Sequence, residues 1–213
     1  MNARAKPGDD ICRGGAVIDE ARRCKRGNPG RCVRAASFIA AATLAHGGAT
    51  LASSVELFDV SGIGAAHTVN NATFVQVAGG GTVGSGDINT IVRIQNTPSE
   101  QGYNTSAATE FDEKGGSFDP NVQLSDIPVV TIDGMPFRQL ILNLNDSGSD
   151  ITLDRLQIFC SPTPKNTGYP NIGTLKYDID SAGDVSVLLG DNNSDSDEID
   201  YVLLFPESVF SGC

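Results

Sequence analysis

The chain has 213 residues, no tryptophan and a formal net charge of −11 at pH 7. Residues 1–52 carry nine Lys and Arg against four Asp and Glu, whereas residues 53–213 carry six against 22. So acidic a body repels phosphate backbones, which argues against nucleic acid as a partner. The length is sufficient for one domain with a sizeable hydrophobic core.

The N-terminal part has the composition of a leader. Residues 1–34 are rich in Arg, Gly and Pro and predict a basic disordered segment. Residues 35–52 combine a short apolar run with small residues and resemble a signal peptide cleaved after Ala52. The run is too short to cross a bilayer, so no transmembrane anchor is expected. Two alternatives stay open: a mis-assigned start, with translation beginning at Val33, and a buried Ala-rich helix of an intracellular protein.

From Ser54 onward, apolar residues recur at period two between clusters of Asn, Asp, Ser and Gly, a pattern typical of half-buried strands joined by turns. The expected strands are Val55–Val60, Val69 with Thr73–Val77, Ile88–Gln95, Ile127–Ile132, Phe137–Leu144, Ile151–Phe159, Leu175–Ile179, Val185–Leu189 and Tyr201–Phe205. The polar stretch Asn96–Asp126 is too long for a plain loop, so we expect it to be partly structured or functional. The pattern predicts an all-β fold, a single antiparallel β-sandwich or jelly-roll-like domain over residues 53–213.

No catalytic set is recognisable, and we do not expect an enzyme. His67 is the only histidine after residue 52, and no serine lies in a Gly-x-Ser-x-Gly motif. The glycine-rich run Gly79–Asp87 lacks the Lys-Ser/Thr pair that would complete a phosphate-binding loop. Acidic residues are numerous, but none lies in a context that singles out a glycosidase pair.

The cysteines divide into two groups. Cys12, Cys24 and Cys32 are separated by 11 and 7 residues, which does not fit a zinc knuckle. Cys160 and Cys213 can form a disulfide in an oxidising compartment, although two cysteines alone leave their pairing open.

Calcium is the one cofactor for which the sequence has a specific pattern. Carboxylates are concentrated in two neighbouring stretches where a hard cation or solvent must neutralise them, and the candidate ligands there are Asp178, Asp180, Asp191, Asn193, Asp195 and Asp197. A weaker pattern follows part of the EF-hand spacing, with candidate ligands Asn143, Asn145 and Asp154. Turns use the same residue types, so solvated hairpin loops are the alternative interpretation at both places.

Three runs in the C-terminal third form an ordered set: Leu153–Phe159 (LDRLQIF), Gly173–Asp184 (GTLKYDIDSAGD) and Tyr201–Phe210 (YVLLFPESVF). The set resembles a group of exported bacterial proteins that usually end in a PEP-CTERM sorting signal. The resemblance covers about Phe137–Phe210 and implies an exported all-β protein of the envelope or extracellular matrix. The Pro-Glu-Pro motif and apolar span of that sorting signal are not found in this sequence.

These observations predict a secreted or cell-envelope protein with a structural or adhesive role, with calcium as a candidate stabilising ion. The expected partners are extracellular polysaccharide or matrix components. The alternative function is a carbohydrate-binding module of jelly-roll type, in which the loops Gly79–Asp87, Thr97–Asp126 and Ser161–Asn171 would form the recognition surface. A sheet face that exposes Tyr103 or Tyr169 beside carboxylates would favour this alternative.

Overall fold

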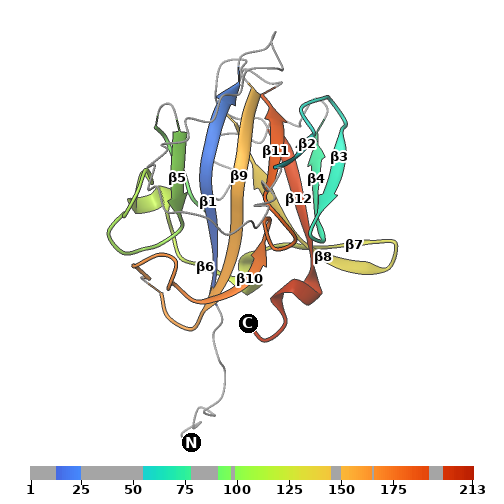
Figure 1. Cartoon of the computed structure of the whole chain (residues 1–213). Coiled ribbons are helices and arrows are strands. Elements are labelled where there is room, and N and C mark those ends of the chain that lie inside the picture. Colours follow the sequence, from blue (N-terminus) through green and yellow to red (C-terminus); the bar gives the residue numbers. More distant parts are fainter. Residues whose placement is uncertain are drawn as a thin grey trace, which may run out of the picture.

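Two β-sheets pack face to face in the computed structural model, which describes residues 55–77, 91–96, 99–144, 150–164, 166–191 and 199–213, and the backbone alone of 13–24 (Figure 1). The predicted all-β sandwich is confirmed. Neighbouring strands are antiparallel, except that β2 and β11 run parallel. Helical structure in the described residues is restricted to three short 3-10 turns, η1 (Gly116–Phe118), η2 (Leu124–Asp126) and η3 (Glu207–Phe210). No helix within the described part of the chain is long and apolar enough to cross a membrane.

The first sheet has seven strands in the order β2-β11-β9-β1-β5, with β10 also paired to β9 and β6 to β1. Its strands are β1 (Arg13–Cys24), β2 (Glu56–Asp59), β5 (Ser99–Tyr103), β6 (Val122–Gln123), β9 (Asp150–Ser161), β10 (Thr174–Asp178) and β11 (Val185–Gly190). The second sheet has five strands in the order β3-β4-β12-β8-β7. Its strands are β3 (Ala66–Val69), β4 (Ala72–Gln76), β7 (Val129–Ile132), β8 (Met135–Leu142) and β12 (Tyr201–Pro206).

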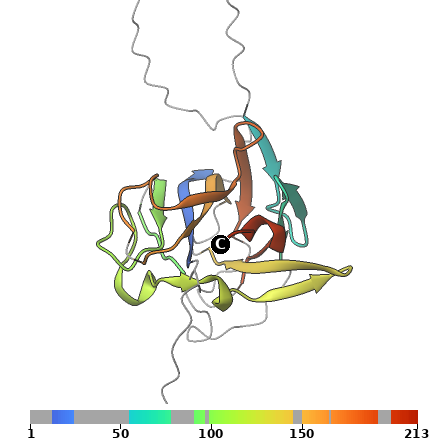
Figure 2. The same ribbon diagram turned by 90° about the horizontal axis from the view of Figure 1, so that it is seen from below.

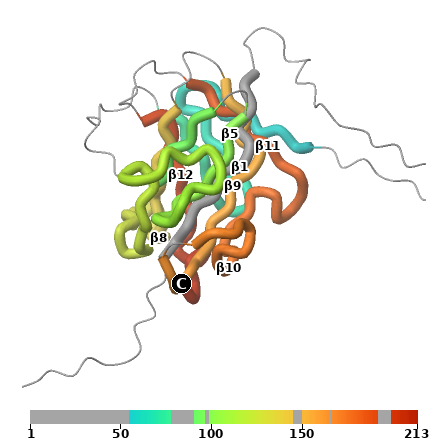
Figure 3. The backbone as a smooth tube through the Cα atoms, turned by 90° about the vertical axis from the view of Figure 1, so that its left-hand side faces the viewer, coloured from blue at the N-terminus to red at the C-terminus, as the bar shows by residue number. Residues whose placement is uncertain are grey.

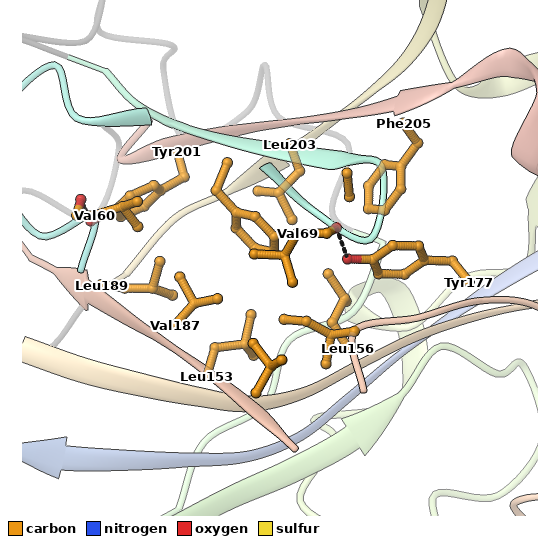
Figure 4. Packing of buried hydrophobic residues seen from close by; sticks show 14 of the residues in the cluster. Val60, Val69, Leu153, Leu156, Tyr177, Val187, Leu189, Tyr201, Leu203 and Phe205 are labelled. Carbon is orange, nitrogen blue, oxygen red and sulfur yellow. Dashed lines mark hydrogen bonds between the residues drawn. The ribbon is translucent and has the colours of Figure 1, made fainter. Parts of the chain in front are cut away.

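Strict alternation of side chains produces the core between the sheets. In β12, Tyr201, Leu203 and Phe205 are buried while the residues between them are partly exposed. They meet Leu153 of β9 and Val187 of β11, which come from the opposite sheet (Figure 4). Full burial of such a side chain contributes about 1.5–3 kcal/mol, so this interface holds the two sheets together.

Two buried tyrosines also join the sheets by hydrogen bonds. Tyr177 of β10 donates its hydroxyl to the carbonyl of Val69 at 2.9 Å (Figure 4). In the opposite direction, Tyr201 of β12 donates to the carbonyl of Val60 at 2.9 Å and accepts the N–H of Gly190 at 2.7 Å. Each buried hydroxyl thereby has backbone partners in the opposite sheet, as buried polar groups generally require.

Strand β1 differs from the expectation for the leader. Residues 1–34 predict disorder, yet Arg13–Cys24 pairs with β9 from Arg13↔Ser161 to Cys24↔Asp150, and with β5 on its other side. Backbone hydrogen bonds to two neighbours hold such a strand without requiring an apolar period of its own. The signal-like residues 35–52 lie outside the described residues.

The region between β4 and β7 also differs in part. The expected strand Ile88–Gln95 is described only from residue 91, where Ile94 makes a single bridge to Glu113 instead of a strand. The polar stretch Asn96–Asp126 is partly structured, as expected, because it contains β5, β6, η1 and η2.

The β7–β8 hairpin projects from one side of the sandwich (yellow in Figure 2). Asp133 and Gly134 form its turn, with φ values of 52° and 80°. Asp-Gly is favoured here because both residues tolerate positive φ, which a two-residue hairpin turn requires. The hairpin exposes Val129, Ile132 and Met135, which are 50%, 41% and 60% accessible.

Candidate functional site

The two acidic connections of the sandwich leave from strand ends that lie at one end of the molecule, which we call the acidic end. Strand β8 ends and β12 begins there, in the register Leu142↔Tyr201, while β11 ends and β9 begins in the register Gly190↔Asp150. Residues 143–150 and 191–200 are the connections that leave from these points. Together they contain seven Asp and Glu and no Lys or Arg. The topology thus brings the bases of both acidic connections to one place.

Two of the described carboxylates at the acidic end are buried. Asp200 is fully buried and accepts the backbone N–H of Leu144 at 2.6 Å. Asp191 is also buried, directly after β11. Burial raises the pKa of the Tyr201 hydroxyl, and the carboxylates of Asp200, Asp150 and Asp59 raise it further. Negative potential therefore accumulates here, which favours a cation.

Asp178 and Asp180 lie elsewhere. Asp178 accepts the N–H of Asp180 at 3.0 Å and the side-chain amide of Gln157 at 2.7 Å, and Asp180 accepts the N–H of Val185 at 2.9 Å. Strand β11 has six residues, about 20 Å at the usual rise, and separates this turn from Asp191. The structure therefore does not bring these two carboxylates together with Asp191, and their contacts are those of the turn interpretation.

The EF-hand-like spacing does not become an EF-hand loop. Residues 150–161 are a continuous strand, so Asp154 lies about 13 Å along β9 from Asp150, where it accepts the hydroxyl of Ser186 at 2.7 Å. Asn143 follows β8 at the acidic end.

The remaining predicted ligands, Asn145, Asn193, Asp195 and Asp197, lie outside the described residues. Over the described ranges, no group of three or more His, Cys, Asp or Glu side chains is arranged to hold a metal ion.

Sequence reasoning missed a second set of carboxylates, in residues 104–121, which we call the β5–β6 loop. Glu113 is buried and accepts the N–H groups of Tyr103 and Phe111 at 3.0 and 2.8 Å. Asp112 accepts the N–H of Gln101 at 3.0 Å, and Glu110 accepts the N–H of Gly168 at 2.8 Å. These side chains bind backbone amides, and such contacts leave no motif in the sequence. The only sign of them there is a cluster of acidic residues within a long polar stretch.

The aromatic residues of this region form a small second core. Tyr103 is fully buried and packs with Phe159 and Ile172, with Tyr169 against them. The Tyr103 hydroxyl donates to Glu110, and that of Tyr169 donates to Gln157 at 2.7 Å. Of the two tyrosines expected on a recognition surface, Tyr103 is therefore part of the interior.

A depression lined by described residues shows no catalytic arrangement. It has a volume of about 760 Å³ and lies between β2, the β3–β4 turn and the β10–β11 turn, where Glu56 and Asp184 are its acidic residues. His67 lies nearby with its ring stacked on Phe58, the centroids 4.0 Å apart, so its contact is one of packing. No family model matches the chain, and no curated protein or solved structure matches it.

Proposed function

We propose that this is an exported, non-enzymatic structural or adhesive protein of the cell envelope or extracellular matrix, stabilised by calcium at its acidic end. The observation that carries the proposal is that the four strand ends joined by the two acidic connections, at Leu142, Asp150, Gly190 and Tyr201, lie at one end of the sandwich. Calcium takes six to eight oxygen ligands, and Asp, Asn and Ser side chains of these two connections are the type it prefers. Binding there would offset repulsion between like charges and cross-link both sheets.

Export is supported by the disulfide between Cys160 and Cys213. Their Cα atoms are 5.7 Å apart, at the usual separation for a disulfide, and the two cysteines are 53 positions apart in the sequence. Disulfides persist mainly in exported proteins, because cytosolic thiols are kept reduced. The signal-like residues 35–52 and the resemblance to PEP-CTERM-associated proteins favour the same compartment.

An adhesive role is supported by the β7–β8 hairpin. Strand β7 is the last strand of the second sheet, and the hairpin exposes Val129, Ile132 and Met135 with only Asp133 as a charge at its tip. An apolar edge of this kind is a usual contact surface. Met135→Lys should weaken attachment to cells or matrix without lowering the Tm; unchanged attachment would remove this support.

Thermal unfolding of the full chain in EDTA and in millimolar calcium, at fixed ionic strength, tests the calcium proposal. An ion that binds only the folded state raises the Tm. At a free concentration of 100 times its Kd, it raises the free energy of unfolding by about 2.7 kcal/mol. Asp195→Asn combined with Asp197→Asn should abolish the rise. Asp178→Asn, which lies beyond β11 from the acidic end, should keep it. A Tm indifferent to calcium would overturn the ion site and leave the acidic connections as solvated turns.

A carbohydrate-binding module is the second candidate, favoured by one observation. Phe111 is 40% exposed and its ring lies 6.2 Å from that of Tyr169, next to the carboxylate of Glu110. Sugars bind beside aromatic faces flanked by polar groups. Glycan screening with the wild type and Phe111→Ala tests this alternative: glycan binding that the substitution removes would support it, and no binding would rule it out.

A further inference from the structure

The β5–β6 loop encloses a carboxylate that is only half satisfied. Asp119 has no exposed surface, and its Oδ1 accepts the N–H of Thr105 at 2.7 Å. Its Oδ2 is buried and has no hydrogen-bond partner among the described residues. Glu113, by contrast, is buried with both oxygens accepting backbone N–H groups, those of Tyr103 and Phe111. A buried carboxylate with an unpartnered oxygen is considerably more costly when it is ionised than when it is protonated.

Asp119 lies where it can control this loop. Thr105, which donates its N–H to Asp119, also donates its hydroxyl to the carbonyl of Asn166 at 2.7 Å. Asp119 thereby joins one end of the β5–β6 loop to the other, and through Thr105 to the loop that follows β9 (green and orange in Figure 3). Tyr103 of the aromatic cluster also donates its hydroxyl to the carbonyl of Asn166, at 3.4 Å.

Two titratable groups face Asp119, and one of them opposes its ionisation. Among side chains that the structure describes, they are Glu113, in the same loop, and the hydroxyl of Tyr103, on β5. Glu113 is acidic, so it opposes a second negative charge nearby.

We propose that the β5–β6 loop is a proton-dependent latch, fastened when Asp119 is protonated and loosened when Asp119 is ionised. The device is independent of the acidic end and of calcium.

The direction of the pH dependence follows from the environment of Asp119. Burial raises its pKa from 3.8 to about 6, and Glu113 raises it as well, while the Thr105 N–H acts in the opposite direction. Because the closed loop binds this proton more tightly than the open loop does, closure is favoured below pH 3.8 and weakens as pH rises through about 6. With these two pKa values, the opening equilibrium should increase about tenfold between pH 5 and pH 7.5.

Hydrogen exchange of the Thr105 amide in the full chain, corrected for intrinsic exchange rates, measures this opening directly. Its protection factor should fall about tenfold from pH 5 to pH 7.5 in the wild type. In Asp119→Asn it should be nearly constant, since asparagine still accepts the Thr105 N–H but carries no titrating group. Asp112→Asn, a carboxylate of the same loop bound to Gln101, should retain the wild-type fall.

Two results would overturn the latch: a Thr105 protection factor independent of pH in the wild type, or a fall that persists in Asp119→Asn. Should that variant fail to fold, the carboxyl carbon chemical shift of Asp119 in the wild type decides the matter. A midpoint near pH 6 supports the proposal, and one near 4 contradicts it.

Discussion

The carboxylate of Asp200 accepts the backbone N–H of Leu144 at 2.6 Å and so fastens the connection after β8 to the residue that precedes β12. The backbone bond from the N–H of Asp200 to the carbonyl of Leu142, at 3.2 Å, reinforces the attachment. The side chains of Asp200 and Leu144 are both buried, with exposed fractions of 0% and 7%. The acidic end is therefore held together by protein contacts before any ion is considered.

Removing this carboxylate should destabilise the fold. Asp200→Ala leaves the N–H of Leu144 buried without an acceptor and should lower the free energy of unfolding by about 1–3 kcal/mol. Denaturant unfolding of the full chain measures the loss. Asp133→Asn is the matched control, since this turn residue has a φ of 52°, which asparagine tolerates, and should change stability by less than about 0.5 kcal/mol. Equal stability of Asp200→Ala and the wild type would contradict the structural role.

The two inter-sheet tyrosines should differ in importance. Tyr177→Phe removes one buried hydrogen bond, to the carbonyl of Val69, whereas Tyr201→Phe removes two, to the carbonyl of Val60 and from the N–H of Gly190. Each such bond contributes about 0.5–1.5 kcal/mol, so Tyr201→Phe should be the more destabilising change.

Tyr169→Phe is a suitable comparison for both tyrosines. Its hydroxyl bonds the half-buried side chain of Gln157, which water can reach, so the loss in unfolding free energy should be smaller. If all three variants unfold at the same denaturant concentration, the hydrogen bonds of the Tyr177 and Tyr201 hydroxyls between the sheets do not contribute to stability.

Loss of the disulfide should weaken the fold substantially. Cys160 and Cys213 are 53 residues apart, and closing a loop of this length restricts the unfolded chain by about 4 kcal/mol in the chain-entropy description. Cys160→Ser with Cys213→Ser should therefore lower the free energy of unfolding by about 2–4 kcal/mol. The wild type should lose a similar amount in reductant, and the double variant should be insensitive to reductant. A wild type whose stability does not depend on reductant would show that the bond does not form.

Arg138 connects β8 to the C-terminal turn η3 and to the segment before β7. Its guanidinium binds both carboxylate oxygens of Glu207, at 2.7 and 2.8 Å, and donates to the carbonyl of Ile127 at 2.8 Å. Lysine cannot reproduce this fork, so Arg138→Lys should destabilise the protein by about 1–3 kcal/mol despite keeping the charge. Lys176→Arg, at a partly exposed residue that binds a single carbonyl, that of Ser211, should be nearly neutral in the same unfolding assay. Similar values for the two variants would contradict the importance of the fork.

The fold class could be predicted because its signals are local. In β12, large apolar residues recur at every second position, at Tyr201, Leu203 and Phe205, and these are the buried residues of the strand. A period of two indicates a β-strand, because successive side chains of a strand point to opposite faces. The Asp133–Gly134 turn also has a local signal, since positive φ restricts the residue types that can occupy it. Strand β1 could not be found this way, because its place depends on partners far along the chain.

The candidate site was predictable only in part. The sequence shows where carboxylates are concentrated, but it does not show which of them lie close together. In the structure, strand β11 keeps Asp178 apart from Asp191. Nor does a run of acidic residues show that Asp119 is buried with one oxygen unpartnered while Glu113 binds two amides. By itself the sequence determined an acidic, all-β chain with its main turns, since periodicity and turn chemistry act between near neighbours. Tertiary structure alone decided which carboxylates meet, which are buried and which tyrosines join the sheets, because burial and hydrogen-bond partners depend on contacts between distant segments.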